Sequence, residues 1–65
     1  MSFEVNETVI IIEDNLNEGV RKGDIGTIIM VYETPNKAYE IEFVDEEGRV
    51  KFQGVYHSNQ IAKLK

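Results

Sequence analysis

The apolar residues of this chain occur in short runs that are rich in β-branched and aromatic side chains and are bounded by polar turn residues. Short runs of this kind are typical of the strands of a small all-β domain. They predict strands at residues 8–12, 25–32, 38–44 and 61–64, and a further strand that begins at residue 50. A single helical turn is expected at residues 58–60. Five short strands with a long first loop, two hairpins and one 3-10 turn before the last strand predict a five-stranded SH3-like barrel.

Residues 38–44 show the clearest alternation of apolar and polar side chains. Tyr39, Ile41 and Phe43 fall on one face, and Glu40 and Glu42 fall on the other, as expected for a strand with one face in a core. The turn residues 45–48 predict a hairpin with a four-residue loop. Counting outward from that loop gives the expected cross-strand pairs, which are Phe43 with Val50, Glu42 with Lys51 and Ile41 with Phe52.

The positions of the glycines in the sequence are best interpreted as structural. Gly23 and Gly26 lead into a β-branched strand and not into a helix, and no Gly-Lys-Ser or Gly-Lys-Thr follows them, so a phosphate-binding loop is disfavoured. We expect Gly23 to permit a turn and Gly26 to permit close backbone approach. Gly48 is expected to take a positive φ in the hairpin, and Gly54 to mark a bend or bulge.

Two runs contain more apolar residues than one face of a barrel needs. If Val9 and Ile11 face the core, then Ile10 and Ile12 face outward, and residues 28–31 do not alternate either. One interpretation is that the second strand bends and serves both sheets, with residues 1–3 covering the rest. The other interpretation is an exposed apolar patch, bordered by Tyr32 and Tyr56, of the kind that marks an interface.

Composition narrows the classes of function that remain. The chain has 65 residues and no cysteine, so we expect a single domain spanning residues 1–65 and no disulfide or thiolate metal site. The formal net charge is -5, which disfavours non-specific binding to a phosphate backbone and favours a basic partner. The N-terminus lacks the features of a secretory signal, and no apolar run is long enough to span a membrane. These features predict a cytoplasmic protein.

No arrangement of residues in the sequence indicates a reaction or a cofactor. His57 is the single histidine, and a general base would need a positioned partner and a pocket. The acidic residues around the 45–48 turn lack the ligand spacing of a calcium loop. No hydroxyl side chain comes with a convincing base. We therefore expect neither an enzyme, nor a bound metal, nor a cofactor.

The segments VIIIEDNLNEGVRKGDIGTIIMVY and AYEIEFVDEEGRV resemble a family of small, uncharacterised bacterial domains with an SH3-like fold. The resemblance covers residues 9–64, and Lys-Gly-Asp-Ile-Gly-Thr is its most specific part. More loosely, the chain is similar to the KOW barrels of ribosomal and transcription proteins and to small photosystem accessory barrels. The resemblance implies a fold and a size, and it carries no established activity. The resemblance also implies an immunity or antitoxin role, since some members of that family lie beside toxin-like genes.

The leading hypothesis is a small acidic module that binds another protein, in its most concrete form an immunity protein or antitoxin that blocks a basic toxin. Charge complementarity would speed the encounter, and apolar anchors would supply much of the affinity. The alternatives are KOW-type nucleic-acid binding through Arg21, Lys22 and Lys37, and a homodimer or accessory subunit built on the apolar strand face. The candidate contact residues are Glu13, Asp14 and Glu18 in the first loop, Asp45, Glu46 and Glu47 at the hairpin tip, and Tyr32 and Tyr56.

Overall fold

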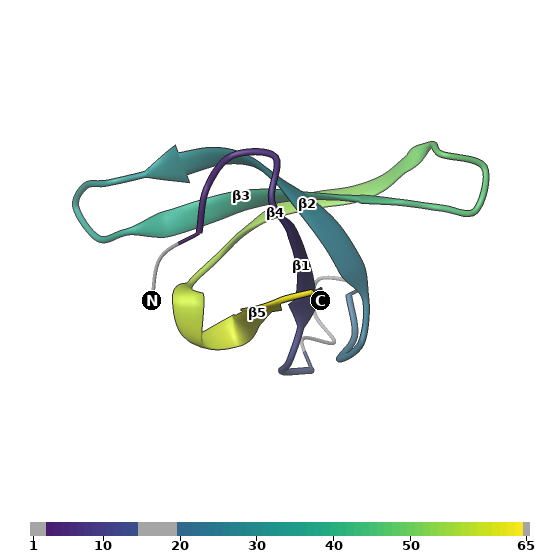
Figure 1. Ribbon diagram of the computed structural model, residues 1–65, viewed down its shortest axis with the longest axis horizontal. Helices are drawn as coiled ribbons and strands as arrows, with labels where there is room; N and C mark the ends of the chain where they lie inside the picture. The colour runs from purple at the N-terminus through teal and green to yellow at the C-terminus, as the bar shows by residue number, and fades with distance from the viewer. Residues whose placement is uncertain (1–2, 15–19, 65) are drawn as a thin grey trace.

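The computed structural model describes residues 3–14 and 20–64 of the chain. They form five antiparallel strands in one sheet, with the spatial order β4-β3-β2-β1-β5 (Figure 1). The elements are β1 (Thr8–Ile11), β2 (Ile25–Tyr32), β3 (Ala38–Val44), β4 (Val50–Tyr56), the 3-10 turn η2 (Ser58–Gln60) and β5 (Ile61–Lys63). The expected all-β class, the five strands and the 3-10 turn before the last strand are confirmed. The first and last strands each end one residue earlier than expected.

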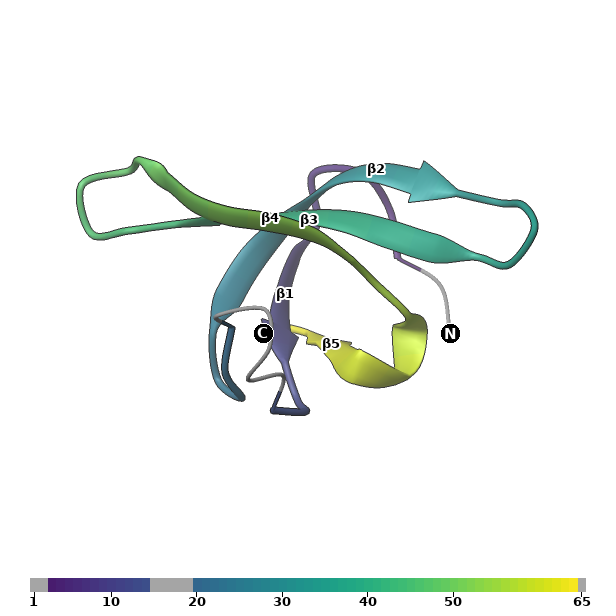
Figure 2. The ribbon, with the colours of Figure 1, turned by 180° about the vertical axis from the view of Figure 1, so that it is seen from behind.

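The sheet bends sharply along β2. Figures 1 and 2 show β3 and β4 along the long axis of the molecule, while β1 and β5 cross below them. Among the described residues, no strand pairing joins β4 to β5, so the ladder has these two strands as its edges. Within residues 3–14 and 20–64, the structure therefore shows a strongly bent five-stranded ladder and does not show it closed into a barrel.

An irregularity in β2 accounts for the apolar run that does not alternate. Ile28 lies opposite Ile41 of β3, and Met30 lies opposite Glu40, so Ile29 is an extra residue at a β-bulge. A bulge resets the alternation of a strand by one position. As a result Ile28 and Val31 both pack toward the core, while Met30 points outward and is half-exposed. The neighbouring turn also meets this point, because the backbone N–H of Asn6 donates to the carbonyl of Ile28.

The expected register of the hairpin between β3 and β4 is wrong by one bulge. Phe43 lies opposite Phe52, and Val44 lies opposite Val50, with a register shift between these pairs that leaves Lys51 as the extra residue. Glu42 therefore lies opposite Gln53 instead of Lys51.

The physical cause of this register is the side chain of Asp45. Its Oδ1 accepts hydrogen bonds from the backbone N–H groups of Glu47 at 2.8 Å and Arg49 at 3.0 Å. The backbone N–H of Asp45 also donates to the carbonyl of Arg49 at 2.8 Å. These bonds close a five-residue loop over residues 45–49, one residue longer than the expected turn.

One core lies on the concave face of the sheet. Tyr39, Ile41 and Phe43 of β3 are fully buried, as their alternation predicted, and Val9 and Ile11 of β1 face the same core. Phe3 is also buried, with its ring edge-on to Tyr39 at a centroid distance of 5.3 Å. Val20, which follows the undescribed part of the first loop, is buried as well. The N-terminal segment therefore covers part of the core, whereas residues 1–2 lie outside the described structure.

Two glycines of the strands face this core. A Cβ on Gly26 would lie 2.6 Å from Cγ2 of Ile41 and 2.9 Å from two carbons of the Phe43 ring. Gly54 pairs with Ile41 in regular register, so the bulge of β4 lies at Lys51 and not at Gly54. Its missing side chain makes room for the Phe52 ring, whose Cε2 would lie 2.9 Å from a Cβ there.

Candidate functional site

The convex face of β2, β3 and β4 carries a patch in which apolar side chains surround one carboxylate. We define the outer-face patch as Met30, Tyr32, Glu40, Gln53 and Val55. Met30, Glu40 and Val55 form one cross-strand row, because Glu40 lies opposite Met30 on one side and opposite Val55 on the other. Met30 and Val55 are 50% and 53% exposed, far more than core residues of their type. The sheet thus presents apolar surface on both sides of an acidic group.

The Glu40 carboxylate is fixed in place by two neighbours. The Tyr32 hydroxyl donates to its Oε1 at 2.8 Å, and Nε2 of Gln53 donates to its Oε2 at 3.1 Å. The hydrogen bond to Glu40, followed by loss of solvent contact and the negative charge of the carboxylate, raises the pKa of the Tyr32 hydroxyl above its usual value. Because both donors come from adjacent strands, the orientation of the carboxylate is set by the sheet itself.

This arrangement suits a cation with an apolar stem. An ionised carboxylate has about four acceptor positions, so two donors leave room for others. Lysine and arginine carry methylene stems that pack on apolar surface while the charged end meets a carboxylate. Met30 and Val55 flank Glu40 in the positions where such stems would lie. The outer-face patch can therefore bind a basic side chain by charge and by apolar contact together.

The acidic side chains of the first loop that the structure describes make hydrogen bonds within the protein. Oδ1 of Asp14 accepts a hydrogen bond from the backbone N–H of Lys22 at 2.9 Å, which ties the two ends of the first loop together. Oε1 of Glu13 accepts a 3.2 Å hydrogen bond from Nε2 of Gln60 in η2. Glu18 lies outside the described residues. Asp14 is thus a loop-closing residue as well as a charge.

The hairpin tip has the same character. Asp45 holds the loop through the backbone bonds described above, and Glu47 pairs with the Arg49 side chain. Glu46 is exposed, without a hydrogen bond to any residue that the structure describes. Figures 1 and 2 both show this tip projecting at one end of the long axis, away from the end of β1. The structure therefore does not gather the two acidic segments into a single surface.

Tyr56 has to be removed from the candidate interface. It is only 2% exposed, and its ring packs edge-on against Phe43 at a centroid distance of 5.8 Å. The alternation of β4 places it inward, opposite Tyr39. His57 follows it and precedes η2, and its backbone N–H donates to Oε1 of Gln60 at 2.9 Å. Of the two tyrosines expected at the surface, Tyr32 lies there and Tyr56 does not.

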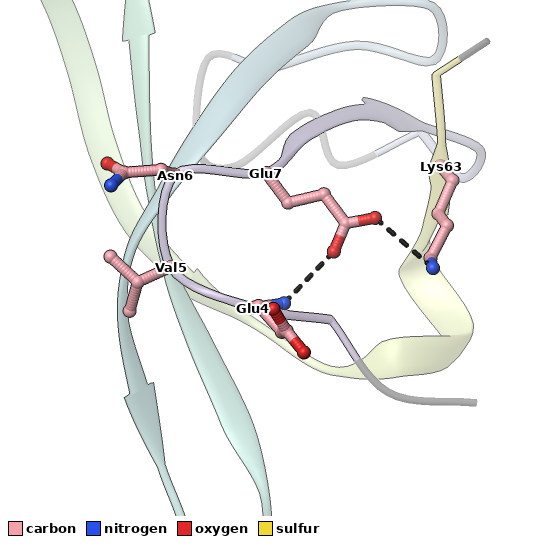
Figure 3. Close-up of a pocket in the computed structure, with 5 residues that line it drawn as sticks. All are labelled: Glu4, Val5, Asn6, Glu7 and Lys63. Atoms are coloured by element: carbon pink, nitrogen blue, oxygen red, sulfur yellow. Dashed lines mark hydrogen bonds and ion pairs between the residues drawn. The ribbon is translucent and has the colours of Figure 1, made fainter.

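A surface depression lies between the N-terminal turn and β5 (Figure 3). Its walls are Glu4, Val5, Asn6, Glu7 and Lys63. The Glu7 side chain points toward Lys63, with Oε2 3.4 Å from Nζ, and its Oε1 accepts the backbone N–H of Glu4 at 3.0 Å. Glu7 and Lys63 thus pair with each other across this depression, and their contact joins β5 to the segment that precedes β1.

The basic residues of the nucleic-acid hypothesis are spread along the molecule. Lys22 precedes β2 and Lys37 follows it, so an eight-residue strand separates them, a span of roughly 25 Å.

Among residues 3–14 and 20–64, no three His, Asp or Glu side chains are grouped so that they could hold a metal ion. Within the same described residues, no helix is long and apolar enough to cross a membrane.

The sequence indicated only part of the outer-face patch. Tyr32 was among the candidate residues, and the alternation placed Glu40 on the outer face. Residues 28–31 were flagged as surplus apolar residues, but the bulge in β2 decides that Met30 is the one beside Glu40. Gln53 and Val55 were missed, because the hairpin register decides their positions relative to Glu40. A bulge leaves little trace in a single sequence beyond a break in alternation, which is what residues 28–31 show.

Comparison with known proteins gives one family. Residues 5–51 match the family described as "Domain of unknown function (DUF4926)". The match runs from the N-terminal turn through β3 and the hairpin tip to the start of β4. No curated protein and no solved structure is significantly similar to the chain.

Proposed function

This chain belongs to a family described as a domain of unknown function (DUF4926), and we propose that it is a small protein-binding module for a cationic partner. We further propose that its strongly bent ladder is a variant of the SH3-like barrel. Five antiparallel strands with a 3-10 turn before the last one support this assignment.

The observation that carries the proposed function is the Glu40 carboxylate. It is oriented by Tyr32 and Gln53, and it lies in one row with the exposed side chains of Met30 and Val55. Large apolar side chains gathered on the surface of a small domain mark interaction sites. A charge held at the centre of such a patch gives a partner orientation as well as affinity. We therefore place the interface on the outer-face patch.

The most concrete form of this function is an immunity protein or antitoxin that covers the basic surface of a toxin. The net charge of -5 supports a basic partner, because opposite charges speed the encounter of two proteins. Exposed acids at the hairpin tip, such as Glu46, would contribute to this long-range attraction. The outer-face patch would then supply the short-range contacts.

Co-expression with the product of the adjacent gene, followed by affinity capture and measurement of Kd, tests this function. Glu40→Gln keeps the size of the side chain and removes its charge. We expect it to weaken binding roughly tenfold or more, as is usual for a hydrogen bond to a charged group. The matched control is Glu46→Gln, which removes the same charge from the hairpin tip, and we expect it to change Kd less than threefold, the scale of an exposed charge.

The pattern of results separates the alternatives. Binding that survives Glu40→Gln but is lost with Glu46→Gln would move the interface to the hairpin tip. No binding to the adjacent gene product, together with salt-sensitive binding to RNA, would contradict the proposed function in favour of the nucleic-acid alternative.

A further inference from the structure

The edge of the sheet beside the outer-face patch carries little of the protection that edge strands usually have. β4 is an edge strand, and residues 52–55 continue in regular register with β3. They include no charged residue and no proline. The one charged residue of β4 is Lys51, which sits at the bulge, beyond this regular stretch. Natural proteins commonly block long edges with charges, prolines or bulges, because an open edge pairs with other strands.

The described loops also make no backbone hydrogen bonds to the unpaired edge of β4. None of the backbone hydrogen bonds made by the described loops and turns involves residues 50–55. Figure 2 shows β4 in front, along the rim of the sheet. A strand paired on one side only directs alternate N–H and C=O groups away from its partner. The edge can therefore accept one more strand.

The position of an added strand relative to Glu40 follows from sheet geometry. Neighbouring strands lie about 4.8 Å apart, so a strand beside β4 would be about 10 Å from β3. Its residue opposite Val55 would extend the row that already contains Met30, Glu40 and Val55. An arginine or lysine in that position could lay its stem over Val55 and bring its charge to Glu40. The β4 edge and the Glu40 carboxylate thus both favour an added strand that has a basic residue opposite Val55.

The inner face of the edge favours an apolar residue. Phe52 is only partly buried, and its ring extends over Gly54, where no side chain competes for the space. An apolar residue of an added strand on this face would cover the exposed part of the Phe52 ring. The favoured sequence therefore alternates basic residues, which face outward, with apolar residues, which face the core side.

We propose that the partner adds a strand of alternating basic and apolar residues to the β4 edge. This inference rests on the proposed function, and it specifies how the cationic partner binds. A second copy of this chain fits the edge less well. The cation of a second β4, Lys51, sits at the bulge outside the regular stretch 52–55, and each copy carries a net charge of -5, so two copies repel. Strand addition draws affinity from main-chain hydrogen bonds and specificity from alternate side chains.

A capped eight-residue peptide that alternates arginine and valine serves as the probe, at low ionic strength. In an extended peptide, alternate N–H groups point to opposite edges. Two modified peptides are therefore compared, one N-methylated at every arginine and one at every valine. We expect one of them to lose at least about tenfold in affinity and the other to bind within about threefold of the unmodified peptide. Amide hydrogens of residues 50–55 should exchange more slowly when the peptide is bound.

The outcomes distinguish this inference from the proposed function. If both methylated peptides bind as tightly as the unmodified one while Glu40→Gln weakens all three, strand addition is wrong and cation recognition stands. If one methylated peptide loses affinity but Glu40→Gln changes nothing, cation recognition by the patch is wrong. A dimer in sedimentation that protects the same amides without peptide would assign the edge to a second copy. Failure of the unmodified peptide to bind at millimolar concentration would overturn strand addition, and the Kd for the adjacent gene product would decide the proposed function.

Discussion

The Tyr32 hydroxyl on β2 donates a 2.8 Å hydrogen bond to Oε1 of Glu40 on β3. Tyr32 lies opposite Ala38, and Glu40 is the next outward residue along β3, so the bond runs diagonally across the ladder. Diagonal neighbours on one face are within reach of aromatic side chains. The bond holds an exposed ring against the strand and leaves the carboxylate facing outward, which is the arrangement on which the proposed interface depends.

The first prediction concerns the titration of Tyr32. Its pKa is raised by the hydrogen bond to Glu40, by loss of solvent contact and by the nearby negative charge. Spectrophotometric or NMR titration should place its pKa above that of a free tyrosine. In the Glu40→Gln variant the negative charge is gone, so the pKa should fall back toward the usual value. An unchanged pKa in this variant would contradict the contact, and Tyr32→Phe identifies the signal.

The sign of the effect on stability follows from linkage. A group whose pKa is raised by folding binds its proton more tightly in the folded state. The hydrogen bond of Tyr32 therefore makes its full contribution to stability at pH values below the pKa of the Tyr32 hydroxyl in the unfolded chain, which is near 10. It is lost as the pH rises through the higher pKa of the folded protein. The difference in unfolding free energy between wild type and Tyr32→Phe should accordingly shrink in that alkaline range and be constant at neutral pH.

The second prediction compares three glycines. Gly26→Ala would place a methyl group 2.6 Å from Cγ2 of Ile41, in a part of the core that cannot move easily, so we expect a loss of about 1–3 kcal/mol. Gly23→Ala meets no atom within 4 Å but requires φ of +97°, so a loss of about 1–2 kcal/mol is expected. Gly54→Ala meets the end of the partly exposed Phe52 ring and should cost the least. Urea unfolding of the three variants gives the order.

The strands of this fold could be predicted from the sequence because the features that specify them are local. Alternation in residues 38–44 fixed the buried face of β3, and the polar clusters marked the strand ends to within a residue. The hairpin register was not accessible in the same way. It depends on whether Asp45 accepts two backbone hydrogen bonds, which adds one residue to the loop. A loop of four or five residues contains the same turn-forming side chains.

The candidate site was less accessible because it depends on contacts between strands. The acidic loops attract attention in a sequence, yet the structure uses Asp14 and Asp45 to close their own loops. Glu40 sits in an ordinary strand pattern and stands out only when Tyr32 and Gln53 are placed beside it. An acidic residue on a strand can be a solvated surface charge or a carboxylate that is held in one orientation by its neighbours. Which of the two it is depends on the register of the neighbouring strands, and a single sequence does not give that register.

The third prediction tests the loop role of Asp45. Asp45→Ala removes the acceptor for two backbone N–H groups, so the free energy of unfolding should fall by about 1 kcal/mol. Glu46→Ala, one position away, removes a charge without breaking such a bond and should change stability by less than about 0.5 kcal/mol. Chemical denaturation of both variants makes the comparison. Equal effects would show that the charge of the tip, rather than the loop geometry, controls its stability.

The fourth prediction concerns the buried hydroxyl of Tyr39. The residue is fully buried, and its hydroxyl has no hydrogen-bond partner among the described residues. Leaving such a group unsatisfied costs about 1–3 kcal/mol relative to its hydrated state. Tyr39→Phe keeps the ring against Phe3 and removes the hydroxyl, so the variant should be as stable as wild type or more stable. Tyr39→Ala, which removes the ring too, should lose about 3–5 kcal/mol. A clear loss of stability in Tyr39→Phe would show that the hydroxyl has a partner in solution.

The last prediction separates the binding role of the outer-face patch from any structural role. Met30 and Val55 are half-exposed and flank Glu40, whereas Ile28 and Ile41 are fully buried one row away. Replacing both Met30 and Val55 by threonine keeps strand propensity and removes apolar surface. Each change should alter the free energy of unfolding by less than about 0.5 kcal/mol, as usual for surface positions, whereas Ile41→Ala should cost about 2–5 kcal/mol. Affinity for the cationic partner or the arginine–valine peptide should nevertheless fall in the double variant, because the stems of the basic side chains lose their contacts. Isothermal titration and urea unfolding of the same preparations measure both quantities. A double variant that loses stability but keeps its affinity would assign these side chains to the fold and not to recognition.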